Sequence, residues 1–99
     1  MVYPIIDVKR TGYKIRQLRK EREISVYEIC EYMGGISEQA VYKWERGQSL
    51  PSVDNLFALS RLFEVHMDDI VEEASEASSV FLGILKTIRS MFYRNYWGK

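Results

Sequence analysis

Apolar residues recur at helical spacing along most of this 99-residue chain. In a first segment of about residues 11–22, Ile15 and Leu18 lie three positions apart and therefore share one face of a helix. A short fifth segment follows at about residues 67–71. Three more helical segments are predicted between the first and the fifth. Their expected core residues are Ile29 and Cys30 in the second segment and Ala40, Val41 and Trp44 in the third. In the fourth segment, they are Val53, Leu56, Phe57, Leu59, Leu62 and Phe63.

Polar residues mark where these helices begin. Ser25 and Glu28 have the spacing of a capping box, in which each side chain accepts a hydrogen bond from the backbone N–H of the other residue. Ser37 and Ser52 are suited to cap the third and fourth helices. The sequence therefore predicts a second helix over residues 25–33.

Glycines mark where the helices end. Gly34 and Gly35 end the second helix, since glycine readily adopts positive φ, and Gly47 closes the third. Because only a short turn joins the second and third helices, they must cross at a steep angle. This arrangement is a helix-turn-helix, whose second helix fits the DNA major groove.

Residues 80–93 predict one further helix. Its apolar side chains fall at i, i+3, i+4, i+7, i+10 and i+11, so they form a single stripe. Such a stripe must be covered by its own domain, by a second subunit or by a membrane surface, and we predict a second subunit. The residues of this predicted dimer interface are Phe81, Ile84, Leu85, Ile88, Met91 and Phe92.

A specific order of motifs runs through residues 12–71. In chain order, the motifs are IRQLRKE, SVYEIC, GISEQAVYKWERG, LPSVDNLFALSRLF and MDDIV. The most specific part is WERG followed by LPS. This order resembles the Cro/repressor-like (Xre-type) helix-turn-helix family. The resemblance implies an all-α fold, a five-helix repressor-like DNA-binding domain over residues 11–74. We expect an N-terminal extension at residues 1–10 and an added amphipathic helix with a basic aromatic tail at residues 75–99.

The chain departs from the family pattern at three places. Val26 stands where the family prefers glutamine, Gly34 and Gly35 make the turn one residue longer than usual, and Glu38 places an acid at the start of the third helix. A glutamine at position 26 would commonly bridge a phosphate and the first recognition residue. Valine cannot form that hydrogen bond, so the contact is lost or moves to Tyr27 or to the turn.

The third helix, over residues 37–46, is expected to read DNA with its N-terminal turn and outer face. Gln39 can pair with adenine, Lys43 can donate to guanine, and Glu38 can accept from the cytosine amino group. The resemblance places Glu38, Gln39 and Lys43 at base-reading positions. We predict base contacts from Ser37, Glu38, Gln39, Tyr42 and Lys43, and phosphate contacts from Arg16, Tyr27, Arg46, Gln48 and Ser49.

Each of these residues also has a structural interpretation, as an ordinary exposed helix residue. Arg46 can form a salt bridge or cap its helix instead of binding phosphate. Glu45 is expected to pair with Arg16 or Arg19, and Trp44 to anchor the core.

Charge is distributed unevenly, although 14 basic and 14 acidic residues give a formal net charge of zero. Seven Lys and Arg residues crowd residues 9–22, whereas residues 64–76 carry six acids. A basic run before a helix-turn-helix is expected to attract DNA, although charge runs also simply solvate surfaces.

An enzyme is poorly supported. Cys30 is expected to be a buried, inert thiol, and His66, the only histidine, has no partner at metal-ligand spacing. No glycine-rich phosphate loop is present, and we expect no cofactor or metal. The lone cysteine excludes an intramolecular disulfide, and no stretch reaches the length of about 20 apolar residues that spans a membrane. With no signal peptide recognised at the start, we expect a cytoplasmic protein.

The sequence therefore predicts a sequence-specific transcriptional regulator that binds double-stranded DNA as a homodimer. The alternative is a protein-interaction module, an antitoxin-like adaptor of the same fold that binds a protein partner and has weak DNA affinity.

Overall fold

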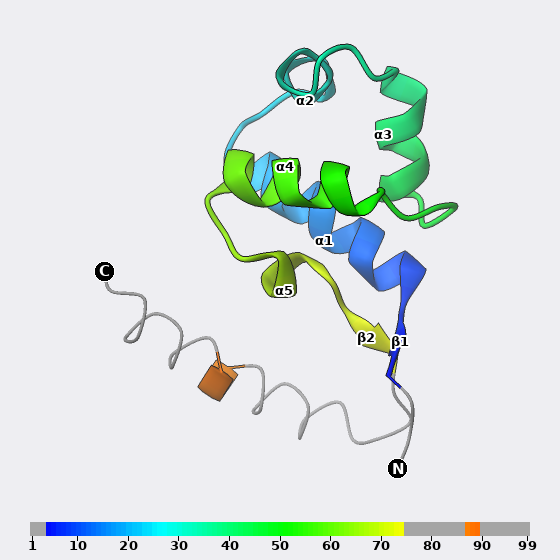
Figure 1. Ribbon diagram of the computed structural model, residues 1–99, viewed down its shortest axis with the longest axis vertical. Helices are drawn as coiled ribbons and strands as arrows, with labels where there is room; N and C mark the ends of the chain where they lie inside the picture. The colour runs from blue at the N-terminus through cyan, green and yellow to red at the C-terminus, as the bar shows by residue number, and fades with distance from the viewer. Residues whose placement is uncertain (1–3, 75–86, 90–99) are drawn as a thin grey trace. The chain divides into compact units, whose positions relative to one another are not determined.

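Five helices form the body of the molecule in the computed structural model, which describes residues 4–74 and 87–89 (Figure 1). They are α1 (Val8–Glu21), α2 (Val26–Tyr32), α3 (Glu38–Glu45), α4 (Val53–Phe63) and α5 (Met67–Ile70). The chain divides into two compact units, residues 6–73, and residues 1–5 with 74–99. The predicted all-α, five-helix fold is confirmed.

A small sheet accompanies the helices. Strands β1 (Ile5–Ile6) and β2 (Glu73–Ala74) pair with each other. Next to this pair, the Asp7 N–H donates to the Glu72 carbonyl at 2.8 Å, and the Glu72 N–H donates to the Thr11 hydroxyl at 2.9 Å. The sequence did not predict this sheet, because strands of two residues are too short to show the alternation of a strand.

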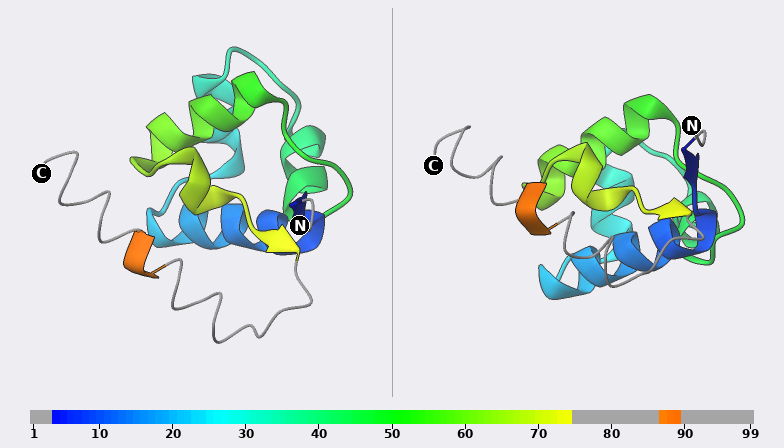
Figure 2. Two further views of the ribbon diagram at one scale, coloured as in Figure 1. Left: turned by 60° about the horizontal axis from the view of Figure 1, so that its bottom comes forward. Right: turned by 90° about the horizontal axis from the view of Figure 1, so that it is seen from below.

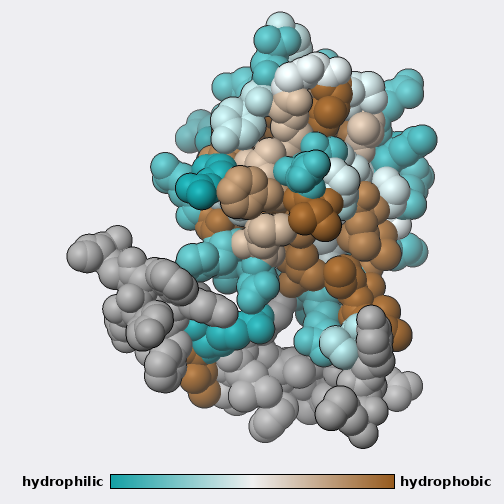
Figure 3. Space-filling view, in the orientation of Figure 1, coloured by the Kyte–Doolittle hydropathy of each residue, from teal (hydrophilic) through white to brown (hydrophobic). Residues whose placement is uncertain are grey.

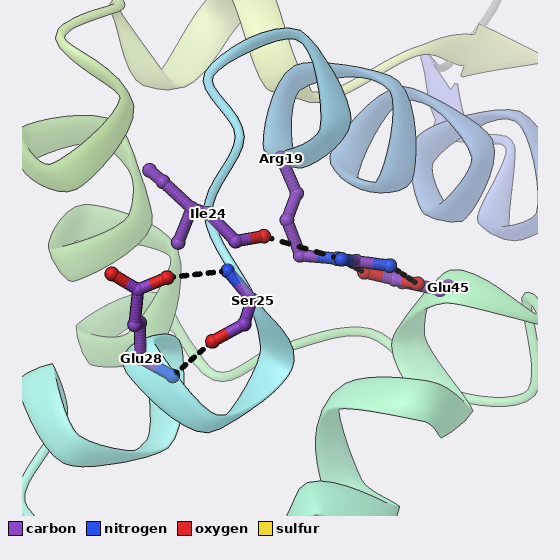
Figure 4. Close-up of polar contacts among 5 residues, drawn as sticks. All are labelled: Arg19, Ile24, Ser25, Glu28 and Glu45. Atoms are coloured by element: carbon purple, nitrogen blue, oxygen red, sulfur yellow. Dashed lines mark hydrogen bonds and ion pairs between the residues drawn. The ribbon is translucent and has the colours of Figure 1, made fainter.

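The helix starts are set by side-chain caps. Ser25 and Glu28 form the predicted capping box, with hydrogen bonds of 3.0 and 2.8 Å (Figure 4). Ser37 and Ser52 cap α3 and α4 as expected. Helix α1 begins at Val8, earlier than the predicted residue 11, because the Asp7 carboxylate accepts from the Arg10 N–H at 2.9 Å.

The core draws on every helix. It consists of Ile15, Leu18, Val26, Ile29, Cys30, Val41, Trp44, Leu59, Phe63 and Ile70. Most predicted core residues are confirmed, but Val53 and Phe57 are not core residues, since they are 73% and 49% exposed. Helix α4 buries the face that holds Leu59 and Phe63, and Val53 and Phe57 project away from it.

Helices α1 and α3 approach closely at Gly12. A Cβ atom added there would overlap the Trp44 carbonyl oxygen and lie 3.0 Å from the Glu45 carbonyl oxygen. Helix α2 is seen nearly end-on in Figure 1 while α3 runs down the view, so the two cross steeply, and Figure 2 shows α1 beneath them from other directions. The contact at Gly12 fixes the end of α3 against α1.

Candidate nucleic-acid interface

One face of α3 is exposed and carries polar side chains. Gln39, Tyr42, Lys43 and Arg46 are exposed at the spacing i, i+3, i+4 and i+7, which places them on one side of the helix. The opposite side holds Val41 and Trp44 in the core. Two cations, an amide and a phenol therefore line a surface that can donate hydrogen bonds to bases and phosphates.

The two ends of α3 are closed by hydrogen bonds. At its start, the Ser37 hydroxyl oxygen accepts from the Ala40 N–H at 3.1 Å. At its end, Gly47 has φ of +75°, its N–H donates to the Trp44 carbonyl at 3.0 Å, and the Gln48 N–H donates to the Lys43 carbonyl at 2.9 Å. The glycine at position 47 thus turns the chain sharply and presents Gln48 and Ser49 at the surface beside α3.

An ion pair joins α1 to the end of α3. Arg19 Nε donates to Glu45 Oε2 at 2.6 Å and Nη2 donates to Oε1 at 3.2 Å, while Nη1 donates to the Ile24 carbonyl at 3.2 Å (Figure 4). The hydrogen bond and charge of Glu45 raise the pKa of Arg19 above its usual value. Of the two partners expected for Glu45, the structure selects Arg19, so the guanidinium of Arg16 is not used in this pair.

Several cations on α1 lie near this site. Lys9, Arg16 and Lys20 are exposed, and none of them has an ion pair within residues 4–74. Lys9 packs beside Gly47, where an added Cβ would lie 2.7 Å from the Lys9 Cα. Because Arg16 and Lys20 follow at i+7 and i+11, the three cations form a row along one side of α1, which starts at Lys9 beside the end of α3.

Helix α2 presents a different surface. Val26 is buried in the core, so the position where the family prefers glutamine supplies packing, while Tyr27 beside it is exposed. Glu28 is also exposed, and hydrogen bonds from Ser25 hold the pKa of its carboxyl below its usual value. That carboxylate is therefore charged at neutral pH and loses its capping contribution only on acidification.

Helical spacing places Glu38 on a flank of α3, between the core side that holds Val41 and the exposed face that carries Gln39 and Lys43. Burial raises the pKa of the Cys30 thiol, and the charges of Glu38 and Glu31 raise it further. Cys30 is the buried thiol that we expected.

All ten residues predicted to contact DNA are exposed, and their roles remain predictions. Arg46 is the C-cap residue of α3 and has no ion pair in the described part of the chain.

His66 precedes α5 as its N-cap residue, and its backbone N–H donates to the Asp69 carboxylate at 3.2 Å. Among residues 4–74 and 87–89, no helix has the length and hydrophobicity to cross a membrane.

Comparison with known protein families shows to which family this chain belongs. A helix-turn-helix family model of the Cro/repressor (Xre) type matches residues 15–70, more than half of the chain. The chain belongs to this family. The match covers α2, α3, α4 and α5 whole and the second half of α1, so it includes the exposed face of α3 and the Arg19–Glu45 pair.

Relatives with curated names include two regulators. The chain is 29% identical over 58 residues to the HTH-type transcriptional activator BcrR of Enterococcus faecalis, covering 59% of this chain and 28% of that protein. It is 28% identical over 69 residues to a putative HTH-type transcriptional regulatory protein of Pyrococcus furiosus, covering 63% and 22%. The similarity thus spans about a quarter of the length of these relatives.

Solved structures share the fold. The restriction-modification controller protein C.AhdI from Aeromonas hydrophila superposes with a TM-score of 0.59 at 23% identity, covering 65% of this chain and 96% of that one. A transcriptional regulator from Listeria innocua gives a TM-score of 0.58 at 18% identity, covering 94% and 80%. At these identities the likeness establishes the fold.

Proposed function

We propose that this chain is a sequence-specific transcriptional regulator that reads the DNA major groove with α3. The observation that carries the proposal is the exposed face of Gln39, Tyr42, Lys43 and Arg46, on a helix fixed from behind by the core and by the Arg19–Glu45 pair. A reading helix needs this combination, because base contacts depend on side chains held at defined positions.

Family membership and charge support the same function. The two curated relatives are named as a transcriptional activator and a putative regulatory protein. The row of Lys9, Arg16 and Lys20 adds positive potential beside α3, and such charge raises DNA affinity without selecting sequence. We place the protein in the cytoplasm, where it would meet double-stranded DNA, and infer that it carries no catalytic activity.

We further propose that it acts as a homodimer. Two-fold pairing would set two α3 helices about 34 Å apart, one turn of DNA. Of the six residues of the predicted interface, all but Ile88 lie outside the described residues, and Ile88 is helical and exposed. That interface stays a prediction.

Changing Gln39 to Ala is expected to weaken binding to the cognate site by about 1–3 kcal/mol, because a bidentate contact to adenine is lost. Lys43→Ala should have an effect of similar size. Affinity for random DNA should change much less for Gln39→Ala, since non-specific binding rests on phosphates. Mobility-shift titrations of both DNAs at one salt concentration measure this. Equal weakening on the two DNAs would remove Gln39 from base reading.

Changing Arg16 to Ala is expected to lower the slope of log affinity against log salt by up to about one unit. Arg16 is exposed and has no ion pair among residues 4–74, so its charge is available to a phosphate. Gln17→Ala, at the exposed neighbouring position, serves as the control and should leave the slope unchanged. An unchanged slope in the Arg16 variant would assign its side chain to solvent.

A second candidate is a protein-interaction module of the same fold. The observation that favours it lies on α2, where Val26 is buried and Glu28 and Glu31 expose negative charge that phosphates would repel. A protein that selects no DNA sequence but binds a protein partner with measurable affinity would support this second function over the first.

A further inference from the structure

Three exposed cations of α1, Lys9, Arg16 and Lys20, form what we call the cation row. Since an α-helix turns by about 100° per residue, the three side chains leave α1 within an arc of about 40°. At a rise of about 1.5 Å per residue, the row is about 16 Å long. Ile15 and Leu18 enter the core from the other side of α1, so the whole row is open to a partner.

The cation row begins beside the end of α3. A Cβ atom added to Gly47 would lie 2.7 Å from the Lys9 Cα, so the first cation is next to the turn that closes α3. Arg16 lies one turn after Gly12 and three positions before Arg19, the two residues through which α1 contacts the end of α3. Two of the three cations are therefore placed beside the end of the helix proposed to read bases.

The charge of the cation row is not neutralised within residues 4–74. None of its members has an ion pair there, and the only acid of α1, Glu21, lies 3.5 Å from Arg22. Arg16 and Lys20 are one turn apart, and like charges at this spacing repel each other and disfavour the helix. An anion bound along the row would remove this cost.

An exposed tyrosine lies along the same side of α1. Tyr13 follows Lys9 by one turn and precedes Arg16 by three positions, and it is 66% exposed. A phenol hydroxyl can donate a hydrogen bond to a phosphate oxygen. Tyr13 thus adds a neutral donor to the three charged ones.

The face over α4 has a different character. Figure 3 shows apolar residues gathered over the middle of the face on which α4 lies in front in Figure 1. A phosphate that is desolvated against apolar side chains gains no hydrogen bond in return. The cation row, and not this face, is therefore the surface that suits a polyanion.

We propose that the cation row and Tyr13 bind the sugar–phosphate backbone of DNA beyond the base pairs that α3 reads. This inference rests on the proposed function, because α3 in the major groove brings the row next to a strand that borders the groove. The length of the row corresponds to about five nucleotide steps of one strand, at about 3.4 Å each, so each cation can meet a different phosphate.

Neutralising two members of the row tests the contact in the full-length protein. Arg16→Gln combined with Lys20→Gln should lower the slope of log affinity against log salt by about two units. From about 50 to about 200 mM salt, the wild type should therefore lose about tenfold more affinity than this variant. The ratio of affinities for cognate and random DNA should not change, because backbone contacts carry no sequence information.

Two controls separate this contact from other effects. Arg10→Gln combined with Lys14→Gln removes the same charge from another side of α1 and should change the slope far less. Urea titration compares the folded stability of the variants. The Arg16 and Lys20 double variant should be at least as stable as the wild type, because a repulsion has been removed. A structural role for these cations would instead lower its stability.

Tyr13→Phe should weaken binding to cognate and random DNA alike by about tenfold, because a hydrogen bond to a charged group is lost. Its salt slope should equal that of the wild type, since no charge is removed. Tyr32→Phe, at a tyrosine of α2 that is 52% exposed, is the matched control and should bind as the wild type does.

Hydroxyl-radical footprinting locates the contact on the DNA. The wild type should protect sugars beyond the enriched base sequence, and the Arg16 and Lys20 double variant should lose this flanking protection alone. A double variant with the wild-type slope would overturn the proposal, and so would one with a lower slope but an unchanged footprint. A wild type that enriches no DNA sequence would contradict the proposed function. A lower slope of the double variant on random DNA would then still support the backbone contact.

Discussion

Changing Glu45 to Ala should lower the free energy of unfolding by about 3–5 kcal/mol, because it leaves the guanidinium of Arg19 without its partner inside the structure. The side chains of Glu45 and Arg19 are only 4% and 12% exposed, and two hydrogen bonds join them. A domain of this size has a total stability of roughly 5–15 kcal/mol, so the loss is a large fraction of it. Urea titration followed by circular dichroism measures the change.

The chain offers a matched control in Glu21, which lies 3.5 Å from Arg22 with 54% of its side chain exposed. Glu21→Ala should cost at most about 1 kcal/mol, as exposed ion pairs do. Replacing both members of the buried pair, with Arg19→Met and Glu45→Leu, should recover much of the stability, since no unpaired charge remains. A Glu45→Ala variant no less stable than Glu21→Ala would contradict the role given to this pair.

Changing Gly12 to Ala should also destabilise the domain, by about 3 kcal/mol. In most helices this substitution stabilises by up to about 1 kcal/mol, because alanine has the higher helix propensity. Here the added methyl group would overlap the Trp44 carbonyl, a backbone atom that cannot rotate away, so α1 and α3 must separate. Thermal unfolding of the variant beside the wild type gives the sign of the effect.

Gln17→Ala is the control for helix propensity, since Gln17 is exposed on α1, and it should change stability by less than about 0.5 kcal/mol. The Gly12→Ala variant should additionally lose affinity for cognate DNA at temperatures where it remains folded, because α3 has shifted. A stabilised Gly12→Ala variant would mean that the two helices do not approach as closely as described.

The helix boundaries were predictable from sequence wherever a local signal sets them. Ser25, Ser37 and Ser52 cap helices through hydrogen bonds that span three residues, so the pattern is visible in the chain itself. The start of α1 was missed because its predicted bounds followed the apolar residues Ile15 and Leu18, which lie well inside the helix, although Asp7 caps it through a hydrogen bond of the same three-residue span. The β1–β2 pair depends on contacts between the two ends of the domain, which short strands do not reveal.

The candidate site was predicted in part. Helical periodicity is enough to place Gln39 and Lys43 on the exposed side of α3, opposite Trp44. Periodicity did not decide between Arg16 and Arg19 as the partner of Glu45, because both lie on one side of α1 and the choice depends on how α3 packs.

Apolar character alone also did not separate core from surface. Val26 was treated as a lost DNA contact and is a core residue, whereas Val53 and Phe57 were assigned to the core and are exposed. The rotation of α2 and α4 about their axes decides these positions, and it is set by packing between helices.

Selection from a pool of random double-stranded DNA tests the central claim most directly. If α3 reads bases, the wild-type protein should enrich one defined sequence, and the Gln39→Ala variant should enrich the same sequence with relaxed preference at one base position in each half-site. Enrichment of no sequence by a folded wild-type protein, or an identical preference in the variant, would contradict the assignment of α3 as the reading helix.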